Sequence, residues 1–237
     1  MTCGLFASLA RAPGTPLPRN AAWTAGCVRA PLRDVDLPSA LAVATTGAAL
    51  AGHLWADAAG RPRARAALKM IASGGFVALG ALSAHDRFGL LILVGLCFSA
   101  AGDALLLSAA ERTFLAGVGA FLLAHVAYAT AFAPGTRISP AAAAILAAVG
   151  TAVMAWLWRR LGTMRIPVLV YTAVISAMLL LGLGTANPLV PWGALLFYLS
   201  DLSVARDRFV RPGLANRIVG LPMYYAAQVL LALSTRS

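Results

Sequence analysis

Long apolar runs separated by short polar gaps dominate the chain from residue 37 onward. Each run is about 17–20 residues long, which is the length that a helix needs to cross the hydrocarbon core of a bilayer. Short gaps between such helices favour antiparallel neighbours in one bundle. The pattern therefore predicts an all-α, polytopic membrane helix bundle over residues 37–237. Its eight transmembrane helices are expected at roughly 37–56, 66–84, 88–109, 114–133, 139–158, 164–183, 189–205 and 215–233.

Composition supports a membrane protein and excludes two other classes. Of the 237 residues, 60% are hydrophobic and 11% are charged, and the mean hydropathy is +0.81. A soluble domain carries about a quarter charged residues, and a disordered chain needs low hydrophobicity. The net charge of +11 would indicate nucleic-acid binding in a soluble protein. Here the arginines fall in short gaps between apolar runs, so no nucleic-acid partner is expected.

Residues 1–36 differ from the rest of the chain and are predicted to form a flexible, basic N-terminal tail. The segment is too interrupted by proline to be the apolar core of a signal peptide. It contains two of the three cysteines, Cys3 and Cys27, while Cys97 lies in an apolar run. This spacing supports neither a disulfide nor a metal site.

The distribution of basic residues predicts an orientation. The gaps after the first, third, fifth and seventh runs hold twelve Lys and Arg residues, and the other gaps with the C-terminus hold three. The positive-inside rule then places the odd-numbered gaps in the cytoplasm and both termini outside, although the four arginines of the tail favour the opposite. The expected location is a bacterial inner (plasma) membrane.

Two of the eight carboxylates lie inside predicted spans, where a charged residue is a functional candidate because its insertion is costly. Asp103 is placed about six residues, or about 9 Å, inside the end of its run. Asp201 lies nearer the end of the seventh run, and both are expected in the cytoplasmic half of the bundle. Asp57, at a helix end, is expected to be a solvated charge, as are Asp86, Glu111 and Asp207.

Other polar residues are expected at the same level. His125 and Tyr128 are three residues apart, and Tyr224 and Gln228 are four apart, so each pair shares a helix face. With Lys69 and Tyr171, they predict a cavity that opens toward the cytoplasmic leaflet, because intramembrane polar groups normally face the protein interior.

Simpler interpretations compete with the cavity. In these interpretations, the Lys69 side chain only extends its ammonium group to the membrane–water interface. His125 is only a hydrogen-bonded core residue. Tyr128, Tyr171 and Tyr198 would be belt aromatics at the headgroups. Tyr225 is expected to point away from the cavity, toward lipid.

At these residues the chain resembles the YhhN-type lysoplasmalogenase family of membrane proteins. The matching motifs are Gly102-Asp103, the Gly-x3-Phe-x3-His-x2-Tyr run that ends at Tyr128, and Ser200-Asp201. Tyr224 and Gln228 follow at a plausible spacing, and the resemblance spans most of residues 60–233. It implies eight helices and hydrolysis of the vinyl ether bond of lysoplasmalogens. The products would be a fatty aldehyde and a glycerophospho-alcohol.

The resemblance and the residue chemistry together predict the site. Vinyl ether hydrolysis needs a general acid and a negative charge beside an oxocarbenium ion, as glycosidases do. Asp103, the deeper residue, is the expected acid, and Asp201 the stabilising carboxylate and water activator, with the reverse assignment open. The further site residues are catalytic His125 and the substrate-binding set Lys69, Tyr128, Tyr171, Ser200, Tyr224 and Gln228.

Lys69 or Arg208 is expected to hold the phosphate of a lysophospholipid substrate. No cofactor or metal is expected, because His53, His85 and His125 lie in separate contexts. The oligomeric state is left open.

Two other functions remain open from sequence. A proton-coupled transporter or lipid-translocating protein would use intramembrane Asp, His and Tyr as a relay, but the chain lacks a visible repeat and paired broken helices. A third hypothesis is a membrane scaffold whose buried polar residues only hold its helices together. Release of aldehyde from a lysoplasmalogen by purified protein separates the enzyme from both alternatives.

Overall fold

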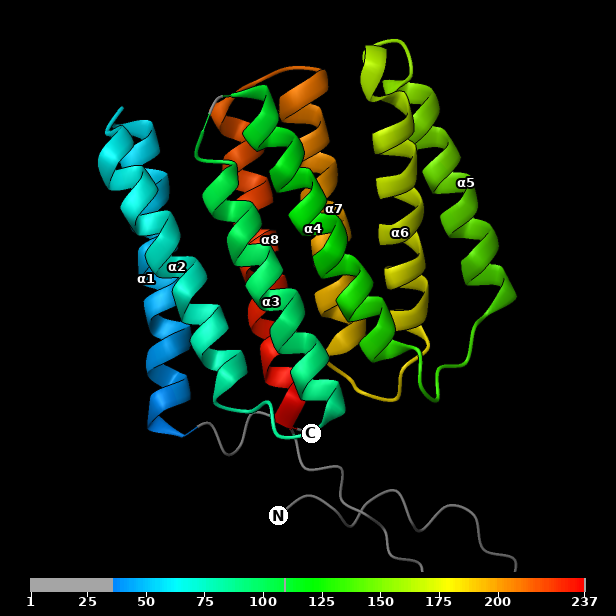
Figure 1. Ribbon diagram of the computed structural model, residues 1–237, viewed down its shortest axis with the longest axis horizontal. Helices are drawn as coiled ribbons and strands as arrows, with labels where there is room; N and C mark the ends of the chain where they lie inside the picture. The colour runs from blue at the N-terminus through cyan, green and yellow to red at the C-terminus, as the bar shows by residue number, and fades with distance from the viewer. Residues whose placement is uncertain (1–35, 109, 237) are drawn as a thin grey trace, which may run out of the picture. The chain divides into compact units, whose positions relative to one another are not determined.

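Eight α-helices account for most of the described part of the chain. The computed structural model describes residues 36–108 and 110–236, and the predicted tail and Cys3 and Cys27 lie outside these residues except for Asp36. The helices are α1 (Leu37–Ala58), α2 (Pro62–Ala81), α3 (Arg87–Leu105), α4 (Glu111–Phe132), α5 (Pro140–Leu157), α6 (Arg165–Leu183), α7 (Val190–Phe209) and α8 (Leu214–Leu233). The all-α bundle and the order of its helices are confirmed (Figure 1).

Helix ends follow local chemistry more closely than hydropathy. Proline lies at one of the first two positions of α1, α2, α5 and α7, where its fixed φ favours a helix start and its missing N–H costs nothing. The predicted start of the second helix at 66 was wrong for this reason, because α2 begins at Pro62. The Asp86 carboxylate caps α3 by accepting from the Gly89 N–H at 2.7 Å.

Two other helix ends bear directly on the site. The third helix was expected to reach residue 109, but α3 ends at Leu105 and a turn follows through Ser108. The seventh helix was expected to end at 205, but α7 continues to Phe209, with Arg206 and Arg208 in its last turn. Cations are favourable there because the carbonyl end of a helix is negative.

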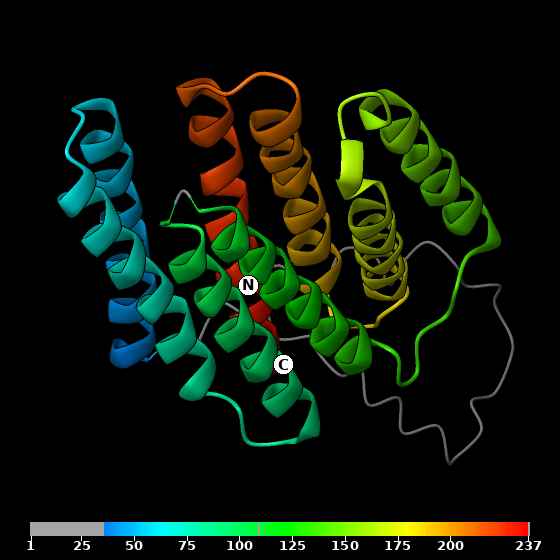
Figure 2. The ribbon, with the colours of Figure 1, turned by 45° about the horizontal axis from the view of Figure 1, so that its top comes forward.

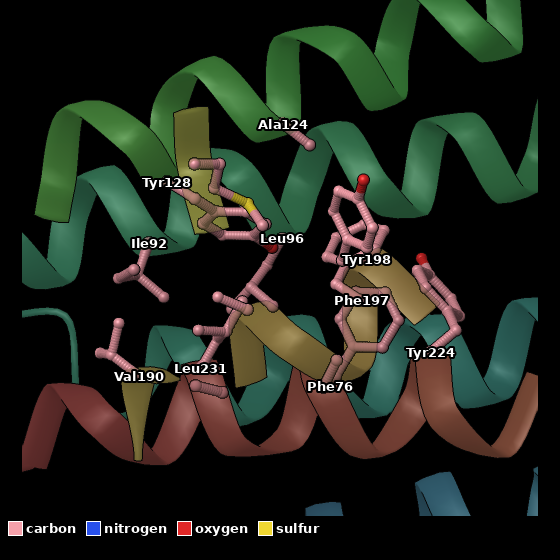
Figure 3. Close-up of a cluster of buried hydrophobic side chains, with 14 of the residues drawn as sticks. Phe76, Ile92, Leu96, Ala124, Tyr128, Val190, Phe197, Tyr198, Tyr224 and Leu231 are labelled. Atoms are coloured by element: carbon pink, nitrogen blue, oxygen red, sulfur yellow. The ribbon is translucent and has the colours of Figure 1, made fainter. Parts of the chain in front are cut away.

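The bundle has a central group of helices and two peripheral pairs. α3, α4, α7 and α8 lie in the middle, the α1–α2 pair lies on one side, and α5 packs on α6 on the other (Figure 1, Figure 2). The main core brings together aromatic and aliphatic side chains from α2, α3, α4, α7 and α8, among them Phe76, Tyr128, Phe197, Tyr224 and Leu231 (Figure 3).

Glycines allow close helix approach at the centre. A Cβ atom at Gly95 would lie 2.2 Å from the Tyr128 ring, and one at Gly102 would lie 2.6 Å from the Phe121 ring. Small residues at helix interfaces are typical of membrane bundles because they let neighbouring helices and bulky side chains meet. Here the two glycines of α3 allow it to pack closely on α4 beside the residues of the candidate site.

The outer surface is suited to lipid. Large apolar side chains are exposed on most helices, with Ile166 at 74% and Trp192 at 63% of their maximum. By length and composition, the helical segments that can cross a membrane within the described residues are six: Leu37–Ala58, Arg87–Leu105, Glu111–Phe132, Pro140–Leu157, Gly162–Leu183 and Leu214–Arg236. α2 and α7 carry more charged residues and pack among the other six. The protein is therefore an integral, multi-pass membrane protein.

Candidate active site

A cavity of about 320 Å³ lies near one end of the bundle and receives side chains from all eight helices. At this end, called the site end below, α1, α3, α5 and α7 finish and α2, α4, α6 and α8 begin. Six of the predicted site residues line the cavity: Lys69, Asp103, Tyr171, Ser200, Asp201 and Tyr224. The polar side chains therefore gather in one half of the bundle, as the sequence indicates.

Asp103 is the centre of a buried ion-pair cluster. Lys69 Nζ lies 3.0 Å from Asp103 Oδ1, and the hydroxyls of Ser73 and Tyr224 donate to Oδ2 at 2.7 and 2.8 Å. The side chains of Lys69 and Asp103 are 11% and 3% exposed. The interpretation of Lys69 as a residue that only snorkels to the interface is therefore wrong, because its ammonium group turns inward to a carboxylate.

Ser73 and Tyr225 extend this cluster and were not expected in it. The Tyr225 hydroxyl lies 3.3 Å from Ser73 Oγ and donates to the Lys69 carbonyl at 3.4 Å. Tyr225 is 2% exposed, so the prediction that it points to lipid was wrong. Ser73 lies four residues after Lys69, which puts both on one face of α2. This spacing was the available sequence signal.

Asp201 also lines the cavity and belongs to a second cluster. The Tyr171 hydroxyl donates to Asp201 Oδ2 at 2.6 Å, and His125 Nε2 lies 3.6 Å from the same oxygen. His125 is fully buried, with its ring 4.5 Å from the centroid of Phe197 and 5.3 Å from that of Tyr171. Tyr171, Tyr128 and Tyr198 are all turned into the bundle, so the belt interpretation of these tyrosines is wrong.

The axial positions of the two carboxylates differ from the prediction. Asp103 lies two residues before the end of α3, about 3 Å along the axis, and Asp201 lies eight residues before the end of α7, about 12 Å. Asp201 is therefore the deeper of the two along its helix. The side-chain exposure runs the other way, at 17% for Asp201 and 3% for Asp103, because Asp103 is covered by its three donors.

Two predicted substrate residues lie outside the cavity lining. The Tyr128 hydroxyl donates to Gln228 Oε1 at 2.7 Å, and both side chains are fully buried. This pair joins α4 to α8 within the core. Ser200 lines the cavity, but its hydroxyl donates to the Phe197 carbonyl at 2.7 Å.

Charged residues at the mouth of the cavity form contacts that the sequence did not predict. Asp57 was expected to be solvated, but its side chain is 8% exposed and pairs with Arg65 at 3.4 Å and with Arg217 at 2.9 Å. Asp207 was also expected to be solvated, and it accepts from the Gly213 N–H and from Asn216. Arg208 lies over the Phe114 ring, 4.2 Å from its centroid.

The chemical groups of the cavity are acids, hydroxyls and cations. Within residues 36–108 and 110–236, no three His, Cys, Asp or Glu side chains are grouped as a metal site requires. The arrangement offers one carboxylate neutralised by an ammonium group, a second carboxyl group with a tyrosine partner, and an apolar wall. It can supply proton transfer and stabilise a transient cation beside an amphiphilic ligand.

The fold and the cavity together define a class: a multi-pass helical membrane protein with a cavity among its helices that is lined by carboxylates, hydroxyls and cations. Residues 64–235 match the YhhN family, which is more than half of the chain. The chain belongs to the YhhN family.

Several named proteins are similar to this chain over much of its length. Lysoplasmalogenase TMEM86A of Bos taurus is 36% identical over 168 residues, which cover 66% of this chain and 69% of that protein. Lysoplasmalogenase TMEM86B of Homo sapiens is 35% identical over 167 residues, covering 70% and 72%. A lysoplasmalogenase of Mycobacterium tuberculosis is 34% identical over 155 residues, covering 59% and 58%. No solved structure matches the chain.

Proposed function

We propose that this protein is a lysoplasmalogenase, an ether hydrolase that cleaves the vinyl ether bond of a lysoplasmalogen within the membrane. The observation that carries the proposal is the presence of two carboxyl groups, Asp103 and Asp201, in one cavity with different partners. Similarity to lysoplasmalogenases of mammals and mycobacteria supports the same activity. The substrate is then a lysophospholipid that reaches the cavity from the surrounding lipid.

The reaction needs a proton and a water molecule. A general acid protonates the vinyl carbon distal to the ether oxygen, and the electron pair of the double bond forms the new C–H bond. The resulting oxocarbenium ion accepts water, which gives up a proton to the conjugate base of that acid. The hemiacetal then collapses to a fatty aldehyde and the glycerophospho-alcohol, whose oxygen receives a proton. One residue can serve as acid and then as base, as in glycosidases.

The contacts favour Asp201 as the acid and Asp103 as the stabilising carboxylate, the reverse of the assignment preferred from sequence. Asp103 accepts from Lys69 on one oxygen and from Ser73 and Tyr224 on the other, so neither oxygen is left to carry the transferred proton. In this proposal the carboxylate, with Lys69 as its counter-ion, lies beside the place where the cation forms. Asp201 accepts from Tyr171 on Oδ2, which leaves Oδ1 to carry the proton that is transferred.

Tyr171 and His125 complete the acid half of the site in this proposal. After the proton leaves, the Tyr171 hydroxyl stabilises the new carboxylate on Asp201. His125, whose Nε2 lies 3.6 Å from Asp201 Oδ2 and whose ring packs against that of Phe197, is a positioning residue for this carboxyl group. Tyr128 and Gln228 then act on the site only through packing, because they join two helices behind it.

In this proposal the alkenyl chain of the substrate binds along the apolar wall of the cavity. On the α4, α5 and α6 side, the cavity is lined by Phe114, Val118, Leu157, Met164 and Val168. The chain leaves an equally apolar lipid environment, so packing against this wall, rather than removal from water, accounts for its binding there. A ligand with its chain on this wall presents its ether linkage to the polar residues between the helices.

The experiment uses purified protein in detergent with a lysoplasmalogen in heavy-oxygen water and deuterium oxide. The expected product is an aldehyde with one deuterium at the carbon next to the carbonyl, and with its carbonyl oxygen derived from water when trapped before exchange. Asp201→Asn and Asp103→Asn should each lower kcat by at least about a hundredfold. Full activity in both correctly folded variants would refute the mechanism.

The proposed location is a bacterial inner membrane with the site end on the cytoplasmic side. The basic residues that support this orientation lie at the site end of the bundle, among them Arg61, Arg159, Arg160, Arg206 and Arg211. Cysteine labelling of intact cells tests it. A cysteine introduced in place of Arg159 should resist a membrane-impermeant reagent, whereas one introduced in place of Arg137 at the opposite end should react.

A further inference from the structure

The mouth of the cavity contains a three-residue charge cluster to which the proposed chemistry assigns no role. Asp57 in the last turn of α1 pairs with Arg65 in the first turn of α2 and with Arg217 in the first turn of α8. Arg65 and Arg217 both line the cavity. Two guanidinium groups against one carboxylate leave a net charge of one positive unit in the cluster.

We propose that Arg65 and Arg217, held by Asp57, form the binding site for the phosphodiester group of a lysophospholipid. This inference rests on the proposed function and adds the residues that select the headgroup. A phosphodiester carries one negative charge, which balances the single net positive charge of the cluster. Each arginine contacts Asp57 through one nitrogen, so its remaining N–H groups can donate to phosphate oxygens.

The two residues expected from sequence to hold the phosphate are engaged elsewhere. Lys69 pairs with Asp103 at 3.0 Å deep in the polar cluster. Arg208 covers the Phe114 ring on the apolar side. Arg65 and Arg217 are 33% and 39% exposed, so they reach both the cavity and the headgroup level.

A backbone contact fixes the position of Arg65 relative to α1. His53 is 4% exposed, and its Nδ1–H donates to the Arg65 carbonyl at 2.8 Å. This contact ties the first turn of α2 to α1. Asp57 lies four residues further along α1, one turn nearer the site end. The Arg65 backbone is therefore fixed by His53, and both guanidinium groups are held by Asp57 before any ligand binds, which lowers the entropic cost of binding.

The spacing along the helices fits a lysophospholipid. Arg65 lies one turn before Lys69 on α2, about 6 Å along the axis, and Arg217 lies two turns before Tyr224 on α8, about 10 Å. Seven bonds separate the phosphorus from the distal vinyl carbon, which an extended chain covers in about 8 Å. A phosphate at the arginines therefore brings the vinyl ether to the level of Asp103 and Tyr224.

The test compares two ligands that the enzyme cannot cleave, a saturated 1-O-alkyl lysophosphatidylethanolamine and the matching 1-O-alkylglycerol without phosphate. Binding is measured by calorimetry on the full-length protein in detergent. Arg217→Gln and Arg65→Gln should each weaken the phosphate-bearing ligand by about tenfold to a hundredfold, and at least tenfold more than the phosphate-free ligand. Arg63→Gln is the matched control, because Arg63 is exposed on the same helix and does not line the cavity.

Three outcomes of the comparison between variants would overturn the site. One is an equal loss for both ligands in each arginine variant, another is no loss for either, and the third is a loss as large in Arg63→Gln. Displacement of the lipid by inorganic phosphate alone, with no dependence on the alkyl chain, would assign the cluster to a free anion and also refute the proposal. Where Arg217→Gln does not fold, Arg217→Lys and Arg65→Gln provide the measurement.

The outcome separates the headgroup site from the hydrolase. Selective loss of binding without aldehyde release by the wild type would retain the phosphate site and refute the proposed reaction. Aldehyde release with no selective loss of binding would do the reverse. Kinetics adds a second measurement on a lysoplasmalogen, where Arg217→Gln should raise KM more than it lowers kcat, because the phosphate is bound in the ground state and the transition state alike.

Discussion

The Lys69–Asp103 ion pair allows a quantitative test of the structure. Breaking a buried pair by removing one partner costs about 3–5 kcal/mol, because the other charge is left without compensation. In Lys69→Met, the Asp103 carboxylate keeps the hydroxyls of Ser73 and Tyr224 and borders the cavity. We therefore expect the lower value, a loss of about 3 kcal/mol in the free energy of unfolding.

Asp103→Asn should cost a similar amount, because it leaves the Lys69 ammonium group at 11% exposure without a carboxylate. The double variant Lys69→Met, Asp103→Asn removes both charges and keeps an amide oxygen to accept from the two hydroxyls. It should lie within about 2 kcal/mol of the wild type, whereas independent effects would sum to about 6 kcal/mol. The double variant should nevertheless lack hydrolase activity, because it lacks the stabilising carboxylate.

Unfolding by SDS in mixed micelles, followed by tryptophan fluorescence, measures these differences. Trp55, Trp156 and Trp192 lie in α1, α5 and α7 and report on both peripheral pairs and the centre. Additive losses in the double variant, or a loss below about 1 kcal/mol in Lys69→Met, would refute the buried ion pair. The ion-pair geometry would then have to be abandoned together with the role assigned to Asp103.

Three further predictions test packing and electrostatics elsewhere. Gly95→Ala should destabilise the bundle by about 1–3 kcal/mol because its Cβ meets the Tyr128 ring at 2.2 Å, whereas Gly119→Ala, with nothing within 4 Å, should be neutral in the same SDS titration. Tyr128→Phe should lower the free energy of unfolding by about 1 kcal/mol, because it removes the hydrogen bond to Gln228. Its KM for a lysoplasmalogen should stay within twofold of the wild type. A large rise in KM would instead place Tyr128 in the substrate site. At the opposite end, the Ser39 hydroxyl and then Arg236 lower the pKa of Asp36 below its usual 3.8, so this carboxylate stabilises the fold above about pH 4 and the benefit disappears as pH falls through its lowered pKa. The difference in thermal midpoint between the wild type and Asp36→Asn should therefore shrink as the pH is lowered below about 4, and a difference that stays constant or grows on acidification would contradict this account.

Hydropathy located the helices but not all of their ends. It reports which residues tolerate lipid, whereas a helix ends where backbone hydrogen bonding ends. Leu106 and Leu107 are apolar, so the sequence extended the third helix through them, but their N–H groups already form a turn. Arg206, Asp207 and Arg208 looked like a loop, but they occupy the last turn of α7. These two errors reversed the apparent depths of Asp103 and Asp201.

The half of the bundle that holds the site was predictable, but the pairing of its residues was not. Intramembrane polar residues face the interior, and this rule placed Asp103, Tyr171 and Tyr224 at one level. No rule of spacing connects Lys69 to Asp103, which lie on different helices, so the lysine was equally compatible with the interface. The partners of each carboxylate decide which one fits the role of acid. They depend on how α2, α3, α6, α7 and α8 pack.

The charges of the site form a gradient that only the assembled helices create. Asp103 and Lys69 cancel each other within the polar cluster, while Asp57 cancels one of two arginines at the mouth and leaves a positive charge there. In the proposed site, a neutral interior next to a positive mouth would orient a lysophospholipid with its phosphate outward and its vinyl ether inward. Asp57 precedes the residues that match the family, 64–235, and it resembles a solvated helix end when read alone. Its contribution follows only from the contact of α1 with α2 and α8, which sets the height at which the two arginines are held.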